Sequence, residues 1–193
     1  MKQFLIFLIM SLSLSANAAL RVLPGSISGF ENYPEELDRI HQAFKVIEVV
    51  LNSNEFKERV LNFKGYNNQG FTSRRGMSHE EIFAFIMQGE EIINGKVTLS
   101  EMNFDIQRHY FGWYYRKKVV AETVPQKSNL IKVSEWFYAR MNVAELASNI
   151  THEWIHLLGF SHRNSKDKTS VPYAVGEIVQ KLSQKLLDQG YLN

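Results

Sequence analysis

Apolar residues in the first half of the chain recur at the spacing of α-helices. Over residues 34–63 they return every three or four positions, as on one buried helix face (Leu37, Ile40, Phe44, Ile47 and Leu51). Pro34 and the acidic residues that follow it favour a helix start. The polar residues 52–54 predict a break, so we expect two helices here. A further helix is predicted from Ser78, with Glu81 completing a capping box, to about Gln88.

The pattern changes after residue 96, where β-branched and aromatic residues dominate as far as residue 138. Residues 119–124 and 130–138 are the better strand candidates, while residues 103–115 are ambiguous. Turn signals at Gly112 and at residues 125–129 separate these segments. This region therefore predicts a sheet.

Two helices are predicted to close the chain, over residues 142–158 and 172–188. Asn142 and Glu145 form a capping start for the first of them. Its apolar stripe should face the core (Val143, Leu146, Ile150, Trp154 and Leu157). Helices, then strands, then two helices predict a single α+β domain over residues 19–193.

The opposite face of the helix over residues 142–158 carries the candidate chemistry. His152 and His156 are four residues apart, so their rings project from one face, one turn apart, and can bind one zinc ion. Glu153 lies about 100° further round the helix. At that position it can hold a water molecule and accept its proton, which makes it the candidate general base.

Gly159 and His162 complete this pattern. A glycine can adopt the left-handed conformation that ends a helix, and the chain can then return His162 to the metal as a third ligand. Three protein ligands leave a fourth position open, as a catalytic zinc ion requires. A bare His-Glu-x-x-His arises by chance in about 1–2% of chains of this composition, but the added glycine and histidine lower this to about 1 in 10,000 or less.

Residues 152–162, HEWIHLLGFSH, resemble the HExxHxxGxxH signature of the metzincin zinc endopeptidases. The resemblance implies a zincin-like α+β fold, with a twisted mixed sheet over an active-site helix and a substrate cleft rimmed by an antiparallel edge strand. It also implies that His152, His156 and His162 bind zinc and that Glu153 is the general base.

The chain departs from this family after the third histidine. Metzincins have a methionine-containing turn beneath the metal, whereas this chain has no methionine after residue 141 and places Pro172 at the corresponding position. Tyr173 follows directly. In some members of the family a tyrosine after this turn stabilises the oxyanion, so Tyr173 is a candidate catalytic residue, with packing of the last helix as the alternative.

The N-terminus predicts export. Lys2, an apolar stretch over residues 4–14 and the small residues Ala16 and Ala18 have the pattern of a signal peptide over residues 1–18. No other segment is apolar enough for a membrane anchor. Because the chain has no cysteine, we expect a bacterial periplasmic or extracellular protein without disulfides.

The expected function is secreted, zinc-dependent endopeptidase activity on protein or peptide substrates, with a water activated by zinc and Glu153. A net charge of +2 gives no reason to expect a nucleic-acid partner, and we expect a monomer. Two alternatives stay open. The same site could act on cell-wall crosslink peptides, or the protein could be a secreted binding module that holds zinc without turnover.

Overall fold

The computed structural model describes residues 19–65, 68–72, 76–89, 91–93, 96–98, 101–115, 117–123, 128–162 and 167–192. The predicted signal peptide lies outside the described residues, as do residues 125–127 of the predicted turn. None of the described helices combines the length and the apolar character that a membrane span requires.

The predicted N-terminal helices are confirmed. α1 (Pro34–Leu51) and α2 (Asn54–Leu61) are separated by two residues, and the Ser53 side chain caps α2 by accepting from the amide of Phe56. α3 (His79–Gln88) begins with the expected capping box between Ser78 and Glu81. The apolar faces of these helices are buried because they pack on the rest of the core.

The described strands form one four-stranded mixed sheet and two smaller pairs. The larger sheet has the order β2 (Ile27–Ser28), β6 (Asp105–His109), β8 (Leu130–Ser134) and β7 (Ala121–Thr123). Its β2–β6 and β6–β8 pairs are parallel, whereas β7 is antiparallel to β8 and forms an edge. β1 (Arg21–Val22) pairs with β5 (Glu101–Met102), and β3 (Glu91–Ile93) pairs with β4 (Lys96–Thr98).

The structure corrects one of the predicted strands and settles the segment whose prediction was ambiguous. Residues 130–138 are not one strand, because β8 ends at Ser134 and α5 (Glu135–Tyr138) follows. The Tyr138 ring, at the end of α5, is buried. The Tyr138 hydroxyl donates to Asn149 Oδ1 at 2.7 Å. The ambiguous residues 103–115 divide into β6 and the short helix α4 (Gly112–Tyr115).

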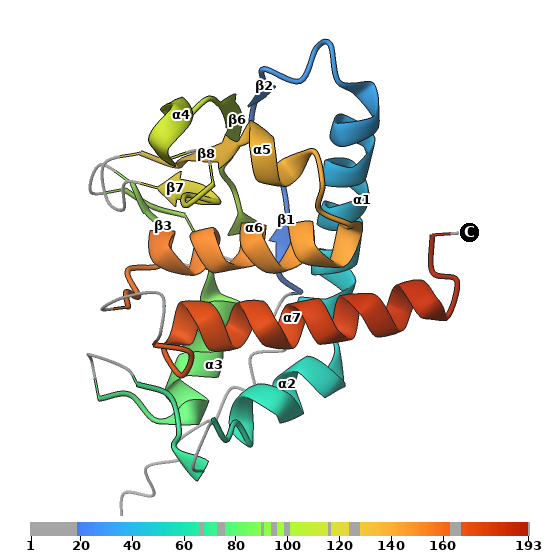
Figure 1. Ribbon diagram of the computed structural model, residues 1–193. Coiled ribbons are helices and arrows are strands. Elements are labelled where there is room, and N and C mark those ends of the chain that lie inside the picture. Colours follow the sequence, from blue (N-terminus) through green and yellow to red (C-terminus); the bar gives the residue numbers. More distant parts are fainter. Residues whose placement is uncertain are drawn as a thin grey trace, which may run out of the picture.

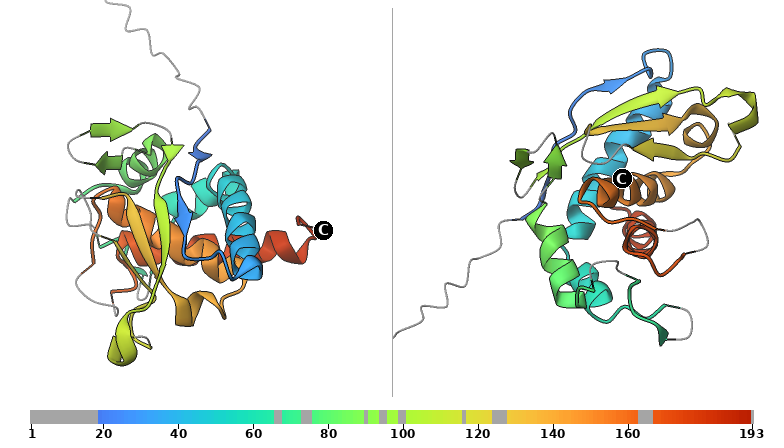
Figure 2. Two further views of the ribbon diagram at one scale, coloured as in Figure 1. Left: turned by 90° about the horizontal axis from the view of Figure 1, so that it is seen from above. Right: turned by 90° about the vertical axis from the view of Figure 1, so that its left-hand side faces the viewer.

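Two long helices form the layer beneath the sheet. α6 (Val143–Leu157) and α7 (Val171–Asp188) lie side by side and antiparallel, and α1 packs across them (Figure 1). The sheet lies over α6, with β7 in contact with this helix (Figures 1 and 2). The mixed α+β architecture is therefore as predicted, and it leaves one face of α6 directed toward the edge strand.

Candidate metal centre

α6 has the two faces that its sequence predicts. Its start is fixed by a capping box in which Asn142 accepts from the Glu145 amide and Glu145 accepts from the Asn142 amide, both at 2.9 Å. Of the five predicted core residues, Val143 is half-buried. The other four are buried (Leu146, Ile150, Trp154 and Leu157). The half-buried rings of His152 and His156 lie on another face, next to a cleft.

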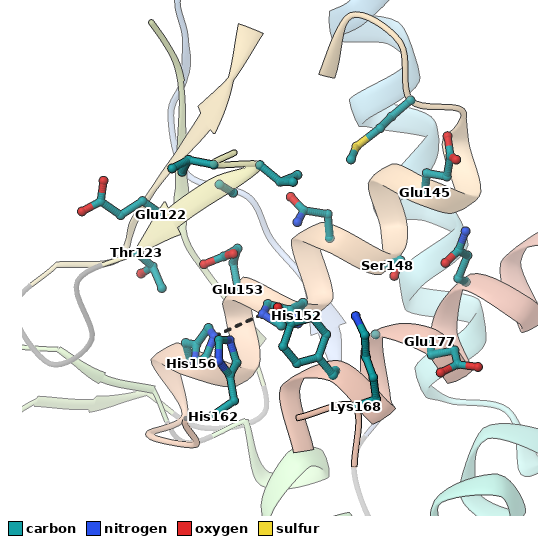
Figure 3. A pocket seen from close by; sticks show the side chains of 18 of the residues that line it. Glu122, Thr123, Glu145, Ser148, His152, Glu153, His156, His162, Lys168 and Glu177 are labelled. Carbon is teal, nitrogen blue, oxygen red and sulfur yellow. Dashed lines mark hydrogen bonds between the residues drawn. The ribbon is translucent and has the colours of Figure 1, made fainter. Parts of the chain in front are cut away.

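The end of α6 turns the chain back toward these rings. Gly159 has φ of 89°, in the left-handed region. Its amide donates to the His156 carbonyl at 2.9 Å, and the Phe160 amide donates to the Ile155 carbonyl at 3.3 Å, as in a Schellman motif. His162 follows this turn and lies beside the other two histidines (Figure 3).

The three histidines form a group that could hold a metal ion. One ring nitrogen from each of His152, His156 and His162 lies within 4.8 Å of the others, the one such cluster found in the described part of the chain. The Nε2 atoms of His152 and His156 are 3.2 Å apart. A tetrahedral zinc ion with bonds of about 2.0–2.1 Å would separate two nitrogen ligands by about 3.3 Å. This pair is therefore already at a ligand spacing.

Backbone carbonyls hold two of the rings in position. His156 Nδ1 lies 2.9 Å from the Phe160 carbonyl oxygen, so it donates there as the neutral Nδ1–H tautomer and leaves Nε2 for a metal. The His152 ring makes a backbone hydrogen bond with Pro172. Burial and the neighbouring His156 and His162 lower the pKa of His152 to about 3, and burial lowers the pKa of His156. Both rings are neutral at neutral pH, as metal ligands must be.

Glu153 is a buried carboxylate at the same site. It is 6% exposed, and it points from α6 toward the space below β7 (Figure 3). Burial raises its pKa to about 8, with a smaller contribution from the negative charge of Glu122 on β7. A carboxyl group in this environment is a stronger base than an exposed one, and a nearby divalent cation would favour its ionised form.

Tyr173 lies against the histidine cluster from the first turn of α7. Its ring centroid is 4.5 Å from that of His152 and 4.7 Å from that of His162. Burial and the charge of Glu153 raise the pKa of Tyr173, so its hydroxyl keeps its proton and can donate. The Lys168 ammonium group lies 4.2 Å from the centre of the same ring.

A turn over residues 167–170 leads directly into α7, and in it the Ser170 amide donates to the Asp167 carbonyl at 3.1 Å. Ser170 directly precedes α7, and its hydroxyl donates to the Asp167 carbonyl at 2.7 Å. Val171 and Pro172 are buried in the first turn of the helix. The position at which metzincins have a methionine is thus part of a helix start that packs behind His152.

A cleft of about 1170 Å³ opens onto the site. Residues 118–123 line one side, and residues of α6 and α7 line the other. The cleft contains His152, Glu153, His156, His162 and Tyr173. All five candidate site residues therefore meet in one place.

Sequence reasoning missed two contributors. The Phe160 carbonyl orients His156, but a backbone group carries no signal in the residue type. Glu122 affects Glu153 across the cleft, and this required the register of β7, which pairs Glu122 with Lys132 of β8. The strand was predicted, but its position over α6 was not.

Comparison with known proteins adds no relative. No family model matches the chain, and neither the curated proteins nor the solved structures contain a significant match to it.

Proposed function

We propose that the protein is a zinc-dependent endopeptidase that hydrolyses peptide bonds. The observation that carries this proposal is the convergence of three histidines with the buried Glu153 in an open cleft. Three imidazoles with a free fourth position favour zinc over Mg²⁺ or Ca²⁺, which prefer oxygen ligands. The fold is accordingly proposed to be zincin-like, with the metzincin arrangement of ligands.

The chemistry that a zinc ion supplies when bound is polarisation of the scissile carbonyl and a lower pKa for the attacking water. Glu153 accepts the proton of that water and delivers it to the leaving amine. Burial suits this role because it keeps the carboxylate free of competing water. The Tyr173 hydroxyl, held in its protonated form, donates to the developing oxyanion.

The edge strand favours a peptide substrate. β7 pairs with β8 on one side, and no described residue pairs with its other side. An extended peptide can add to such an edge through main-chain hydrogen bonds. Thr123 Oγ1, in the wall of the cleft, is buried without a hydrogen-bond partner among the described residues and could bind a polar group of the substrate.

The test is zinc analysis of the chain from residue 19 onward, combined with digestion of a peptide library. We expect about one zinc ion per chain and cleavage within peptides. Glu153→Gln should retain zinc and lose about 100- to 10,000-fold in kcat/KM. Glu177→Gln, at the far end of the cleft and paired with Lys181, is the matched control and should retain both.

Two results would reject the proposal. A Glu153→Gln variant with wild-type turnover would remove the general base. Stable zinc binding without cleavage of any peptide would favour a binding module. Digestion of purified cell-wall material alone would assign the same site to crosslink peptides.

Export to the periplasm or the medium and the monomeric state belong to the same proposal. Cell fractionation tests the first, and size-exclusion chromatography tests the second.

A further inference from the structure

A second surface of the molecule carries exposed aromatic rings. Tyr110, Trp113, Tyr114 and Tyr115 are 53, 76, 63 and 55% exposed. Among the described residues, they account for four of the seven large hydrophobic side chains that are exposed to this degree. Soluble monomers rarely concentrate such side chains in one place without a binding role.

The rings lie on and beside α4, at the outer margin of the molecule. α4 follows β6 and leads by way of residues 117–120 to β7 (Figures 1 and 2). Gly112 starts this short helix with φ of 76°, and a Cβ atom at this position would meet no other atom within 4 Å. The rings project from the body instead of closing onto the core.

Positive charge lies beside one of these rings and along the segment that follows them. The sequence over residues 106–121 contains four arginine and lysine residues and no acidic one. The Lys118 ammonium group lies 3.9 Å from the centre of the Tyr114 ring. Arg140 and Lys117 lie 3.7 and 5.2 Å from the centre of the Trp136 ring, next to this turn. Arg108 is the exception, because Glu36 and Glu135 neutralise it.

We propose that this surface, formed by Tyr110, Trp113, Tyr114 and Tyr115 with Lys117, Lys118 and Arg140, binds peripherally to an anionic lipid bilayer. We call it the α4 surface. Tryptophan and tyrosine partition to the boundary between headgroups and acyl chains. Lysine and arginine beside them attract the phosphate groups of anionic lipids. The two classes of side chain together match the chemistry of that boundary.

The arrangement of the rings favours a bilayer over a glycan or a nucleic acid. Sugars and bases stack on open, flat ring faces. The Tyr114 and Tyr115 rings are at 89° to each other and form no common platform. Cations already lie over the faces of Tyr114 and Trp136. Insertion among headgroups requires no such platform.

The α4 surface also adjoins the cleft of the metal centre. Lys118 belongs to both, since it lines the cleft and contacts Tyr114. Binding at the α4 surface would therefore hold the mouth of the cleft near the bilayer. This inference does not depend on the proposed hydrolysis, because it uses none of the candidate metal ligands or catalytic residues.

The experiment is flotation of the chain from residue 19 onward with lipid vesicles, which removes the apolar N-terminal stretch as a source of binding. We expect partitioning onto mixed phosphatidylglycerol and phosphatidylcholine vesicles, weakening in high salt, and little onto phosphatidylcholine alone. Lys117→Gln with Arg140→Gln should weaken partitioning about 25-fold, at about fivefold for each cation. Trp113→Ser should weaken it roughly tenfold.

The controls change matched residues elsewhere. Lys45→Gln with Lys64→Gln removes two exposed cations, and Tyr191→Ser removes an exposed ring near the C-terminus. These variants should partition as the wild type does, and all variants should keep the wild-type thermal melting curve. Equal loss in the control and test variants would overturn the proposal. So would failure of the wild type to bind either vesicle, or its retention only on insoluble cell-wall glycan or on single-stranded DNA.

Discussion

Replacing Gly159 by alanine should weaken zinc binding about 5- to 30-fold. Gly159 has φ of 89°, where a Cβ atom costs roughly 1–2 kcal/mol. The metal-free variant can relieve that strain by leaving the left-handed conformation, which moves the Phe160 carbonyl away from His156 and displaces His162. Zinc binding must restore the turn. The strain energy is therefore subtracted from the binding free energy, and about 1–2 kcal/mol corresponds to this change in Kd.

The assay is competition for zinc with a chromophoric chelator. Gly190→Ala is the matched control, because Gly190 has φ of 82° after the last helix and lies outside the cleft. It should lower the unfolding free energy by a similar amount but leave the zinc Kd unchanged. Gly159→Asn should fall between the wild type and Gly159→Ala, since asparagine tolerates this conformation better. Wild-type zinc affinity in Gly159→Ala would refute the role of the turn.

Three further predictions concern stability and catalysis. The metal-free protein should be most stable in urea unfolding near pH 6.5. As the pH falls below 6.5, the unfolded chain protonates His152 and His156 while burial keeps both neutral in the folded chain, with the His152 pKa at about 3, so stability is lost. Glu153, whose pKa burial raises to about 8, offsets one of these histidines between pH 4.5 and 6.5 and removes stability as the pH rises from 6.5 to 8, because only the unfolded chain has released that proton; stability that rises from pH 6.5 to 8 would contradict this. Zinc at about 100 times its Kd should add about 2.7 kcal/mol to the unfolding free energy, reversed by a chelator, and an unchanged melting temperature would argue against a metal site. Tyr173→Phe should lower kcat with little change in zinc content, and an unchanged kcat would restrict Tyr173 to packing.

The helices and the candidate metal ligands could be predicted from sequence because their determinants are local. The capping boxes at Ser78 and Asn142 lie within four residues of the amides they bind. His152 and His156 share a face through helix geometry alone, and a glycine at position 159 is the residue that a helix end requires. Each of these signals acts over one or two turns of chain.

The strands were harder to predict because their determinants are distant. β1 and β2 have two residues each and carry no pattern of their own. They are strands because they pair with β5 and β6, far along the chain. The aromatic residues of α5 suggested a strand, but the burial of Tyr138 and the ion pair of Glu135 with Arg108 determine a helical turn there.

The parallel pairing of β2 with β6 has a consequence for the order of folding. Ser26 and Asp105, which are hydrogen-bonded beside this pair, are 79 residues apart in sequence. The three histidines lie within eleven residues. The loss of chain entropy on closing a loop grows with its length, so the ligand cluster can assemble early while the sheet forms late. Metal present during folding should therefore speed refolding.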